Sequence, residues 1–359
     1  MPWRLLKKLE TFWALAMTTT DSGRPHLHAE LLVPSASNIK RCAQALQSGE
    51  LVAFPTETVF GLGAAVSQLG AIEGIFKAKG RPSEHPLIAH VAPGAELTGW
   101  VAELTPTMQM LMNAFWPGPL TLVVPKGERM PFEVTGGQNS VGIRCPSHPV
   151  AIELLKATGV PVAAPSANRF GKVSPTRASH VLAELGDRIP FILDGDVPEV
   201  GIESTIVSLL DDQPAILRPG AITAAQIEAV LGVAVKSHGE VSKTPNANPR
   251  VSGALEKHYS PDAKVWVLQA SELAALQLQN KTLCVGWTDE FLAQADALRE
   301  KFGEVLVEAL SDKPAEVAKA LYATLRQADA LACKQVLFEK PAAGAAWEAV
   351  ADRLKRASA

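Results

Sequence analysis

The stretch VGIRCPSHPVAIELLKATGVPVAAP, residues 141–165, indicates the architecture of the chain most clearly. Its two ends, 141–144 and 161–165, are short apolar runs without polar alternation, which is typical of strands buried on both faces. Between them, residues 148–159 carry apolar side chains at helical spacing and end at a glycine, which indicates a helix. A strand, a helix and a second strand in this order predict an α/β sheet whose faces are covered.

The same alternation extends from this stretch in both directions. We expect a helix at 37–50, with Ser37 as its N-cap and Gly49 as its stop. The other expected strands are 51–54, 87–91, 120–124, 191–194, 205–210 and 215–218, and the other expected helices are 71–78, 178–186 and 223–232. Together these elements predict one α/β domain over residues 35–235.

A second domain is predicted after a change of composition. Residues 236–261 are polar and rich in Pro, Gly, Ser and Asn, which is typical of a linker. From 262 to 359 a new alternation of the form βαβαβαβα predicts a small parallel sheet. Its expected strands are 264–268, 282–287, 304–310 and 335–338, and its expected helices are 271–279, 289–303, 314–330 and 345–357. This domain lacks a dinucleotide fingerprint and any polar cluster at its strand ends, so the sequence assigns it no chemistry.

The overall composition is that of a soluble globular protein. The 359 residues suggest two domains, with 47% hydrophobic and 20% charged residues. The formal net charge of -3 argues against a protein that binds nucleic acid or an anionic membrane over its whole surface. No run reaches the roughly 20 apolar residues of a membrane span.

The cysteines and the N-terminus favour a cytoplasmic location. The four cysteines have no zinc-binding spacing, so we expect them to be small buried side chains in a reducing compartment. Residues 1–34 are an N-terminal extension. Leu6, Leu9, Trp13 and Ala16 fit a short amphipathic helix, and a true start at Met17 is the alternative. An export signal fits less well, because Glu10 interrupts the apolar segment.

Small, hydroxyl and basic residues gather where the predicted strands of the first domain end. The clusters cover 54–64, 78–91, 139–149 and 164–176, with two later ones at 201–207 and 217–220. Because ligands bind open α/β sheets where loops leave the carboxyl ends of strands, these clusters are candidates for a single site.

Two of these clusters suit phosphate oxygens. Lys79 supplies a point charge and Arg81 a planar fork, with Gly80 between them. The loop at 164–176 adds three short donors, Ser166, Asn168 and Ser174. Taken alone, each cluster also fits an ordinary solvated turn.

Arg144 ends an apolar strand, where an unpaired cation is costly. It therefore needs a carboxylate, which either the protein or a ligand can supply. His85 and His90 lie five residues apart, but no third ligand completes a zinc site, so no metal held by protein side chains is predicted. His90 either orients a polar ligand or is a hydrogen-bonded core histidine. Glu57 and Glu203 are conceivable acid–base groups, although nothing in the sequence pairs them.

Several common motifs are absent from the sequence. There is no Walker sequence, no dinucleotide fingerprint, no G-x-S-x-G elbow and no kinase signature. A nucleotide would therefore need a different cradle. No activated nucleophile is evident either, which favours direct in-line attack by one bound substrate on another.

Taken in order, these clusters resemble the YrdC-domain superfamily, in the longer two-domain form found in threonylcarbamoyl-AMP synthases. The signature pair is Lys-x-Arg followed by Ser-x-Asn, here Lys79, Arg81, Ser166 and Asn168. The supporting motifs are PTETVFGLG, PLIAHV, WPGPLTLV, VGIRCPSHP, SPT, ESTIV and LRPG, and the resemblance continues through HYSP in the linker to the C-terminal domain. It implies a YrdC-like open twisted sheet with helices on its faces, plus a smaller Rossmann-like parallel α/β domain.

The resemblance also implies a reaction. L-threonine, bicarbonate or CO2 and ATP would form threonylcarbamoyl-adenylate and pyrophosphate, with Mg2+ as an expected companion of ATP. The product would serve a separate transferase system that modifies tRNA, with a weak direct contact to tRNA conceivable. The implied nucleotide-binding residues are Lys79, Arg81, His85, Ser140, Ser166, Asn168, Ser174, Arg218 and Tyr259, where the signature four are also catalytic and Tyr259 belongs to a lid formed by the linker. The implied threonine-binding residues are Thr58, His90, Arg144, Ala164 and Ser204.

Some features depart from the resemblance. Phe60 stands where a tyrosine is frequent, His85 occupies a variable position, and residues 1–34 have no counterpart. The alternative function is a module of this fold that binds double-stranded RNA or tRNA without forming an adenylate. The acidic net charge and the lack of aromatic residues among the basic ones count against it.

Overall fold

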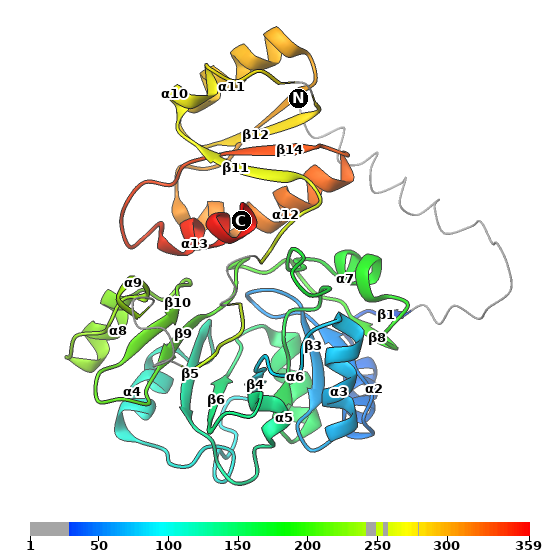
Figure 1. Ribbon diagram of the computed structural model, residues 1–359. Helices are drawn as coiled ribbons and strands as arrows, with labels where there is room; N and C mark the ends of the chain where they lie inside the picture. Colours follow the sequence, from blue (N-terminus) through cyan, green and yellow to red (C-terminus); the bar gives the residue numbers. More distant parts are fainter. Residues whose placement is uncertain (1–28, 242–248, 254–257, 279) are drawn as a thin grey trace, which may run out of the picture.

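The computed structural model describes residues 29–241, 249–253, 258–278 and 280–359. The helix considered near the N-terminus and the alternative start at Met17 lie outside the described residues. In the described part, the chain forms one sheet of ten strands and one of four, each covered by helices (Figure 1). The predicted α/β class is therefore confirmed.

The large sheet is mixed and has the strand order β1-β8-β2-β3-β7-β4-β6-β5-β9-β10. β4 and β6 are parallel neighbours, which places His90 beside Arg144 at the ends of their strands. β7 runs antiparallel to β4, and β5 antiparallel to β6. The strands are β1 (Glu30–Leu32), β2 (Val52–Phe54), β3 (Gly61–Ala65), β4 (Ile88–His90), β5 (Leu120–Pro125), β6 (Ser140–Arg144), β7 (Val162–Ala163), β8 (Phe191–Leu193), β9 (Thr205–Ser208) and β10 (Ala215–Arg218).

The sequence did not predict β3, because its glycines are poor strand formers. The structure gives a steric reason for Gly63. A Cβ there would come within 2.8 Å of side-chain carbons of Phe54 and Val162. Glycine is therefore what allows this strand to lie between its neighbours.

Helices cover both faces of the large sheet (Figure 1). The first helix begins about half a turn earlier than the sequence predicts. Its N-cap is Ser35 and not Ser37, because the hydroxyl of Ser35 accepts a hydrogen bond from the backbone N–H of Asn38. The helices of this part are α2 (Ala36–Gln47), α3 (Leu69–Lys79), α4 (Pro106–Phe115), α5 (Phe132–Thr135), α6 (Pro149–Thr158), α7 (Ala178–Leu185), α8 (Ala224–Leu231) and α9 (His238–Val241).

The small sheet is parallel throughout and has the order β11-β14-β12-β13, as the alternation predicted. The helix expected at 271–279 is shorter, because it ends at Leu273 after four residues. The strands are β11 (Lys264–Leu268), β12 (Thr282–Gly286), β13 (Val305–Ala309) and β14 (Gln335–Glu339), and the helices are α10 (Ala270–Leu273), α11 (Asp289–Phe302), α12 (Pro314–Ala330) and α13 (Glu348–Ala357).

Helices α12 and α13 lie between the small sheet and the first domain (Figure 1). One hydrophobic cluster joins the two sides, with Val59, Val173 and Ile202 from the first domain and residues of both helices from the second. The approach is close at Gly201, where a Cβ would lie 2.4 Å from Cα of Lys319. The two domains therefore share a packed interface next to the loops that follow the strands of the large sheet.

The four cysteines are buried and unpaired, as predicted. Burial raises the pKa of the Cys145 and Cys284 thiols to about 12, so these thiols are poor nucleophiles. Among the described residues, no helix is long and apolar enough to cross a membrane.

Candidate active site

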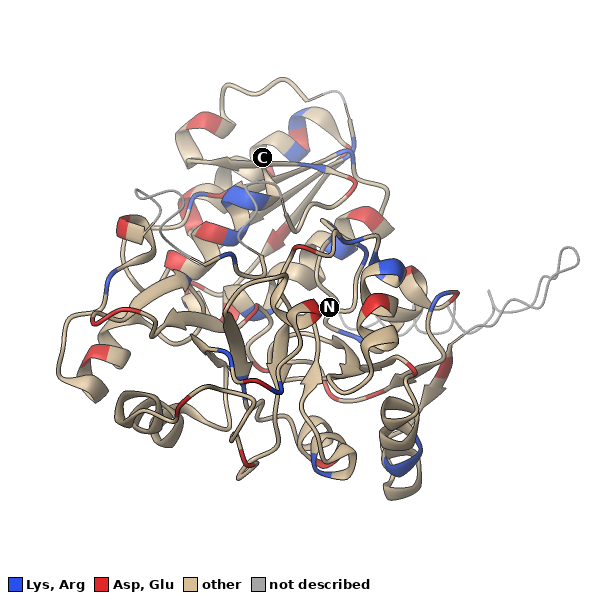
Figure 2. Cartoon of the chain, turned by 60° about the horizontal axis from the view of Figure 1, so that its bottom comes forward, with Lys and Arg blue, Asp and Glu red and all other residues tan. Residues whose placement is uncertain are grey.

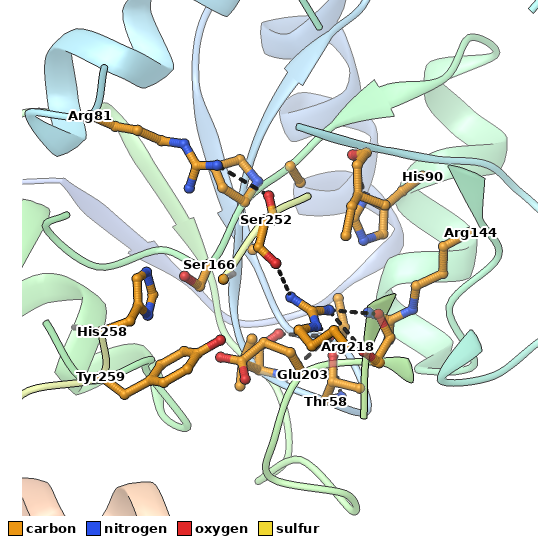
Figure 3. A pocket seen from close by; sticks show the side chains of 18 residues that line it. Thr58, Arg81, His90, Arg144, Ser166, Glu203, Arg218, Ser252, His258 and Tyr259 are labelled. Atoms are coloured by element: carbon orange, nitrogen blue, oxygen red, sulfur yellow. Dashed lines mark hydrogen bonds between the residues drawn. The ribbon is translucent and has the colours of Figure 1, made fainter. Parts of the chain in front are cut away.

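A cavity of about 520 Å³, including its open mouth, lies where the polar clusters of the first domain meet (Figure 3). Its walls come from the loop before β3, from β4, from the end of β6, from the loop after β7, and from the residues around β9 and β10. Described parts of the linker close one side. The lining residues are Thr56, Thr58, Val59, Gly61, Arg81, Ile88, His90, Arg144, Ala164, Pro165, Ser166, Glu203, Ser204, Arg218, Ser252, Gly253, His258 and Tyr259.

The residues predicted to bind threonine all line this cavity. They are Thr58, His90, Arg144, Ala164 and Ser204. Pairing of β4 with β6 and β7 places His90, Arg144 and the segment leading to Ala164 side by side. Five positions spread over almost 150 residues therefore converge because of the strand order.

Arg144 has a carboxylate partner inside the protein. Its Nη2 donates to Oε1 of Glu57 at 2.6 Å, and both side chains are about 5% exposed. Nε donates to the carbonyl of Gly118, and Oε2 of Glu57 accepts from the backbone N–H of Ser147. Among the described residues these hydrogen bonds engage Nη2 and Nε, so Nη1 is the nitrogen with which a substrate carboxylate can pair.

His90 is a neutral imidazole at physiological pH. Burial, together with the nearby charge of Arg144, lowers the pKa of His90 to about 3. Its Nδ1 lies 3.1 Å from the carbonyl oxygen of Ile88. A neutral ring fixed in this way can offer its other nitrogen to a polar ligand, which fits the orienting role considered from the sequence.

Arg81, Ser166 and Arg218 form a second group of predicted ligand-binding residues in the cavity. Arg81 Nη2 donates to the carbonyl of Pro86 and to the hydroxyl of Ser252, while its buried Nε has no partner among the described residues. Burial is the main reason why the pKa of Arg81 falls to about 10. Two cations that line the cavity, and an unsatisfied N–H on one of them, suit an anionic ligand.

Three other predicted residues stand behind the cavity wall. Lys79 is 3% exposed, and its ammonium donates to the carbonyl oxygens of Ser166 and Asn168 at 2.6 and 2.5 Å. Asn168 donates to the carbonyls of Arg169 and Lys172. Ser174 donates to Glu203 at 2.6 Å. Among the described residues these side chains do not line the cavity, and they hold the loops that do.

The remaining nucleotide candidates, Ser140 and His85, are not among the lining residues of the cavity. Ser140 lines a neighbouring hollow, which also includes Arg250, Val251 and Ser252 of the linker and adjoins the cavity at Ile88. His85 is partly exposed, and its ring packs edge-on against Phe170 at 5.4 Å. Both positions are close to the cavity without lining it.

Linker residues complete the cavity. Tyr259 is 1% exposed and has φ +60°, and its hydroxyl lines the cavity without a partner among the described residues. Its ring lies 4.1 Å from that of His258. Ser252 accepts from Arg81 through its hydroxyl and from Arg218 Nη1 through its carbonyl. The linker therefore contacts both arginines that the sequence assigned to the nucleotide.

Sequence reasoning did not assign roles to Thr56, Ser252 or His258. It considered Glu57 and Glu203 as conceivable acid–base groups, but the structure pairs each with an arginine, Glu57 with Arg144 and Glu203 with Arg353. The sequence signal that pointed to these two residues was a carboxylate within a stretch rich in Ser and Thr. Their partners lie up to 150 residues away, which the sequence does not indicate.

The described residues contain no group of three or more His, Cys, Asp and Glu side chains that could hold a metal ion. Cationic and anionic residues are interspersed over both domains (Figure 2). This distribution of charges is typical of a protein that binds a ligand in a local pocket, and less typical of one that binds nucleic acid over a continuous basic surface.

Two buried histidines and one half-buried histidine should make the fold sensitive to acid. Burial lowers the pKa of His90, His180 and His258 to about 3 from an ordinary 6.5. Between pH 6.5 and pH 3 these histidines are therefore protonated in the unfolded chain and neutral in the folded protein. The free energy of unfolding therefore decreases as the pH falls from 6.5 toward 3. Each histidine should cost up to about 2 kcal/mol at pH 5 relative to neutral pH.

Urea unfolding at pH 7 and pH 5 measures this effect. His180 lies outside the cavity, and its Nδ1 accepts from the backbone N–H of Thr176. His180→Gln keeps an acceptor and should reduce the loss between the two pH values by about a third. An unchanged loss in His180→Gln would show that other groups cause the acid sensitivity.

Two family models match consecutive parts of the chain. The Sua5/YciO/YrdC model, described as telomere recombination, matches residues 44–220. A model described as the C-terminal domain of threonylcarbamoyl-AMP synthase matches residues 222–359. The boundary between the two matches falls just after β10.

Curated proteins and solved structures agree with these matches. Threonylcarbamoyl-AMP synthase of Pyrococcus abyssi is 36% identical over 328 residues, which are 89% of this chain and 94% of that protein. The Bacillus subtilis protein of the same name is 44% identical over 234 residues, 65% of this chain and 67% of its own. The crystal structure of P. abyssi Sua5 complexed with L-threonine aligns with a TM-score of 0.79 and 34% identity, and covers 91% of this chain and 96% of that one.

Proposed function

The chain belongs to the threonylcarbamoyl-AMP synthase family with both domains of that family, and we propose that the cavity of the first domain is where it joins threonine, bicarbonate or CO2, and ATP. The product is threonylcarbamoyl-adenylate, and pyrophosphate leaves. One observation carries the proposal: a set of residues suited to an amino acid and a set suited to phosphates line the same cavity.

We assign the amino-acid side to Arg144, His90 and Thr58, with Ser204 and the backbone of Ala164 completing it. Nη1 of Arg144 would pair with the threonine carboxylate, while Glu57 holds the guanidinium in place. Neutral His90 would orient the substrate by a hydrogen bond. The crystal structure of the P. abyssi relative was solved with L-threonine, which supports an amino-acid pocket in this fold.

We assign the phosphate side to Arg81, Arg218 and Ser166, with Tyr259 closing over it. Ser140 lines the adjoining hollow and His85 lies in the loop after Arg81, and the rest of the nucleotide would extend toward them. Three predicted residues would contribute without touching the substrates, namely Lys79, Asn168 and Ser174. Their hydrogen bonds set the position of the loop that carries Ser166 and the position of Glu203.

The reaction does not require a covalent intermediate with the protein. A carbamate oxygen of N-carboxythreonine attacks the α-phosphorus of ATP, a new P–O bond forms, and the bond to the pyrophosphate oxygen breaks. Arg81 and Arg218 offset the charge that develops on the phosphate oxygens. Holding both substrates in one cavity supplies much of the remaining acceleration.

Mg2+ would come with the phosphates of ATP. The described residues contain no group of three or more His, Cys, Asp and Glu side chains that could hold it, and we derive no step through the ion. The adenylate then passes to a transferase system that modifies tRNA. Because that system, ATP and tRNA meet in the cytoplasm, we place the enzyme there, with at most a transient contact to tRNA.

The proposal predicts pyrophosphate release that depends on all the substrates. Purified protein with ATP, L-threonine and bicarbonate should release pyrophosphate, and omission of threonine or bicarbonate should reduce the rate to background. A coupled pyrophosphate assay, with mass-spectrometric detection of the adenylate, measures this. A rate unchanged without threonine would contradict the function. Affinity for tRNA that falls steeply with salt, without any adenylate, would favour the RNA-binding alternative.

A further inference from the structure

Arg353 of α13 reaches from the C-terminal domain into the wall of the cavity. Its side chain is fully buried, and Nε donates to Oε2 of Glu203 at 2.9 Å. Nη1 donates to the carbonyl of Pro219, just after β10. The guanidinium also lies over the ring of Tyr259, with 5.5 Å between its carbon and the ring centre. One side chain therefore touches three segments that build the site.

A second residue of the C-terminal domain shares this contact. The hydroxyl of Tyr322, on α12, donates to Oε2 of Glu203 at 2.8 Å, and its ring lies 5.4 Å from that of Tyr259. The other oxygen of Glu203 accepts from Ser174. The Glu203 carboxylate, which lines the cavity, is thus held by one residue of the first domain and two of the second (Figure 3 shows Glu203 beside Tyr259 and Arg218).

The position of Glu203 affects residues on both substrate sides of the cavity. The next residue, Ser204, accepts from Arg218 through its carbonyl at 2.8 Å and through its hydroxyl at 3.1 Å. Its hydroxyl also lies 2.8 Å from that of Thr121. A shift of Glu203 would therefore move Ser204 on the amino-acid side and Arg218 on the phosphate side together.

The geometry points to a function for the C-terminal domain: we propose that Arg353, assisted by Tyr322, is a positioning residue that holds Glu203, Ser204 and Tyr259 in the arrangement the reaction requires. This inference rests on the proposed function for its activity measurements. The alternative is that the C-terminal domain only stabilises the protein. The positioning role and the stabilising role predict different results for variants of the same interface.

Electrostatics keeps the carboxylate charged in this position. Burial raises the pKa of Glu203, but the charges of Arg353 and Arg218 and the hydrogen bonds from Ser174 and Tyr322 outweigh it and lower the pKa to about 2. The other titratable groups that act on this cluster are His258, Tyr259 and Asp352. Without Arg353, the strongest influence that lowers this pKa would be lost, and the carboxyl would take up a proton at a higher pH than in the wild type.

Three substitutions of graded severity test the proposal. Arg353→Met removes the charge and the fork, Arg353→Lys keeps the charge, and Tyr322→Phe removes one hydroxyl. We expect kcat/KM for threonine and for ATP to fall about 10- to 100-fold in Arg353→Met, and about tenfold in Tyr322→Phe. Arg353→Lys should restore part of the activity.

The matched control is another interdomain ion pair. Arg326 of α12 pairs with Glu184 of α7 at 2.6 Å, and both side chains are mostly buried. Neither residue lines the cavity. Glu184→Gln should lower Tm and leave kcat and both KM values within about twofold of the wild type, because the Gln amide oxygen can still accept the hydrogen bond from the backbone N–H of Arg169 and the change does not touch Glu203.

A pH profile and a coupling measurement give readouts that stability alone does not change. In Arg353→Met, kcat should fall on the acid side at a higher pH than in the wild type, and Arg353→Lys should not show this shift. Combining Arg353→Met with Glu203→Gln should remove the acidic shift and give a loss in kcat/KM smaller than the product of the two single losses.

The outcomes separate the two roles and the underlying function. If Tyr322→Phe and Arg353→Lys lower only Tm, as Glu184→Gln does, the positioning role is wrong. If the effects of Arg353 and Glu203 multiply without coupling, it is also wrong. Failure of the proposed function appears differently, as a wild-type protein without threonine-dependent pyrophosphate release. Calorimetric titration of L-threonine into the folded variants then still compares the geometry of the site, and unaltered affinity across them would overturn the positioning role.

Discussion

Replacing Arg144 by alanine should lower the free energy of unfolding by about 3–5 kcal/mol, because the substitution leaves the buried Glu57 carboxylate without its partner. It should also raise the KM for threonine by roughly 100-fold or more, since the cation to which we assign the substrate carboxylate is gone. The KM for ATP should change far less. Urea unfolding and steady-state kinetics with each substrate varied in turn measure the two effects.

A double substitution separates binding from stability. Arg144→Met with Glu57→Gln replaces the ion pair by two neutral side chains of similar volume, so most of the lost stability should return while threonine binding stays absent. Glu57→Gln alone keeps the guanidinium and should retain threonine binding. Equal increases in both KM values for Arg144→Ala would contradict its place on the amino-acid side, as would recovery of threonine binding in the double variant.

The case of Arg144 shows what the sequence could predict about the site. A cation at the end of an apolar strand requires a carboxylate, and that reasoning holds in the structure. The sequence left open whether protein or ligand supplies the partner, because Glu57 is 87 residues away and is brought near by strand order. The chemistry of a residue is local, but its partner is decided by tertiary structure.

The motif around Lys79 shows a different limit. Local pattern identified the loop and its charges, and Gly80 ends the helix in the left-handed conformation expected of a glycine. The direction of each side chain depends on packing, however. Arg81 lines the cavity, while the ammonium of Lys79 is buried against the carbonyls of the Ser-x-Asn loop. Two cations in one tripeptide therefore reach different surroundings.

The C-terminal domain was the least predictable part of the site. Its alternation predicted a parallel sheet, and the strands are as expected apart from their exact ends. Arg353 lies in a helix whose sequence, EAVADRLKRA, resembles an ordinary charged helix surface. Only the packing of α13 on the first domain shows that this arginine is buried and reaches Glu203. Arg356 of the same helix is buried as well and Lys355 is exposed, and the sequence does not indicate which of these cations reaches the first domain.

Lys79→Met should lower kcat by about 100-fold or more, although the ammonium does not line the cavity. The substitution leaves the carbonyls of Ser166 and Asn168 without their buried donor, which costs about 1–3 kcal/mol for each. The loop should relax toward solvent to satisfy them and take the Ser166 hydroxyl away from the phosphate side that we propose. A displacement of about 1 Å at reacting groups is enough for a loss of this size. Pyrophosphate release under saturating substrates measures it.

Lys77 provides the matched control, because it lies in the same last turn of α3 and is exposed. Lys77→Met removes an equal charge from the same helix end and should leave kcat within about twofold of the wild type. A similar loss in both variants would mean that general electrostatics near the helix end matters and that the loop contact does not. If Lys79→Met instead raises the KM for ATP with kcat unchanged, the lysine contributes ground-state binding of the nucleotide and the positioning argument fails. Retention of both parameters would show that the loop keeps its place without the ammonium.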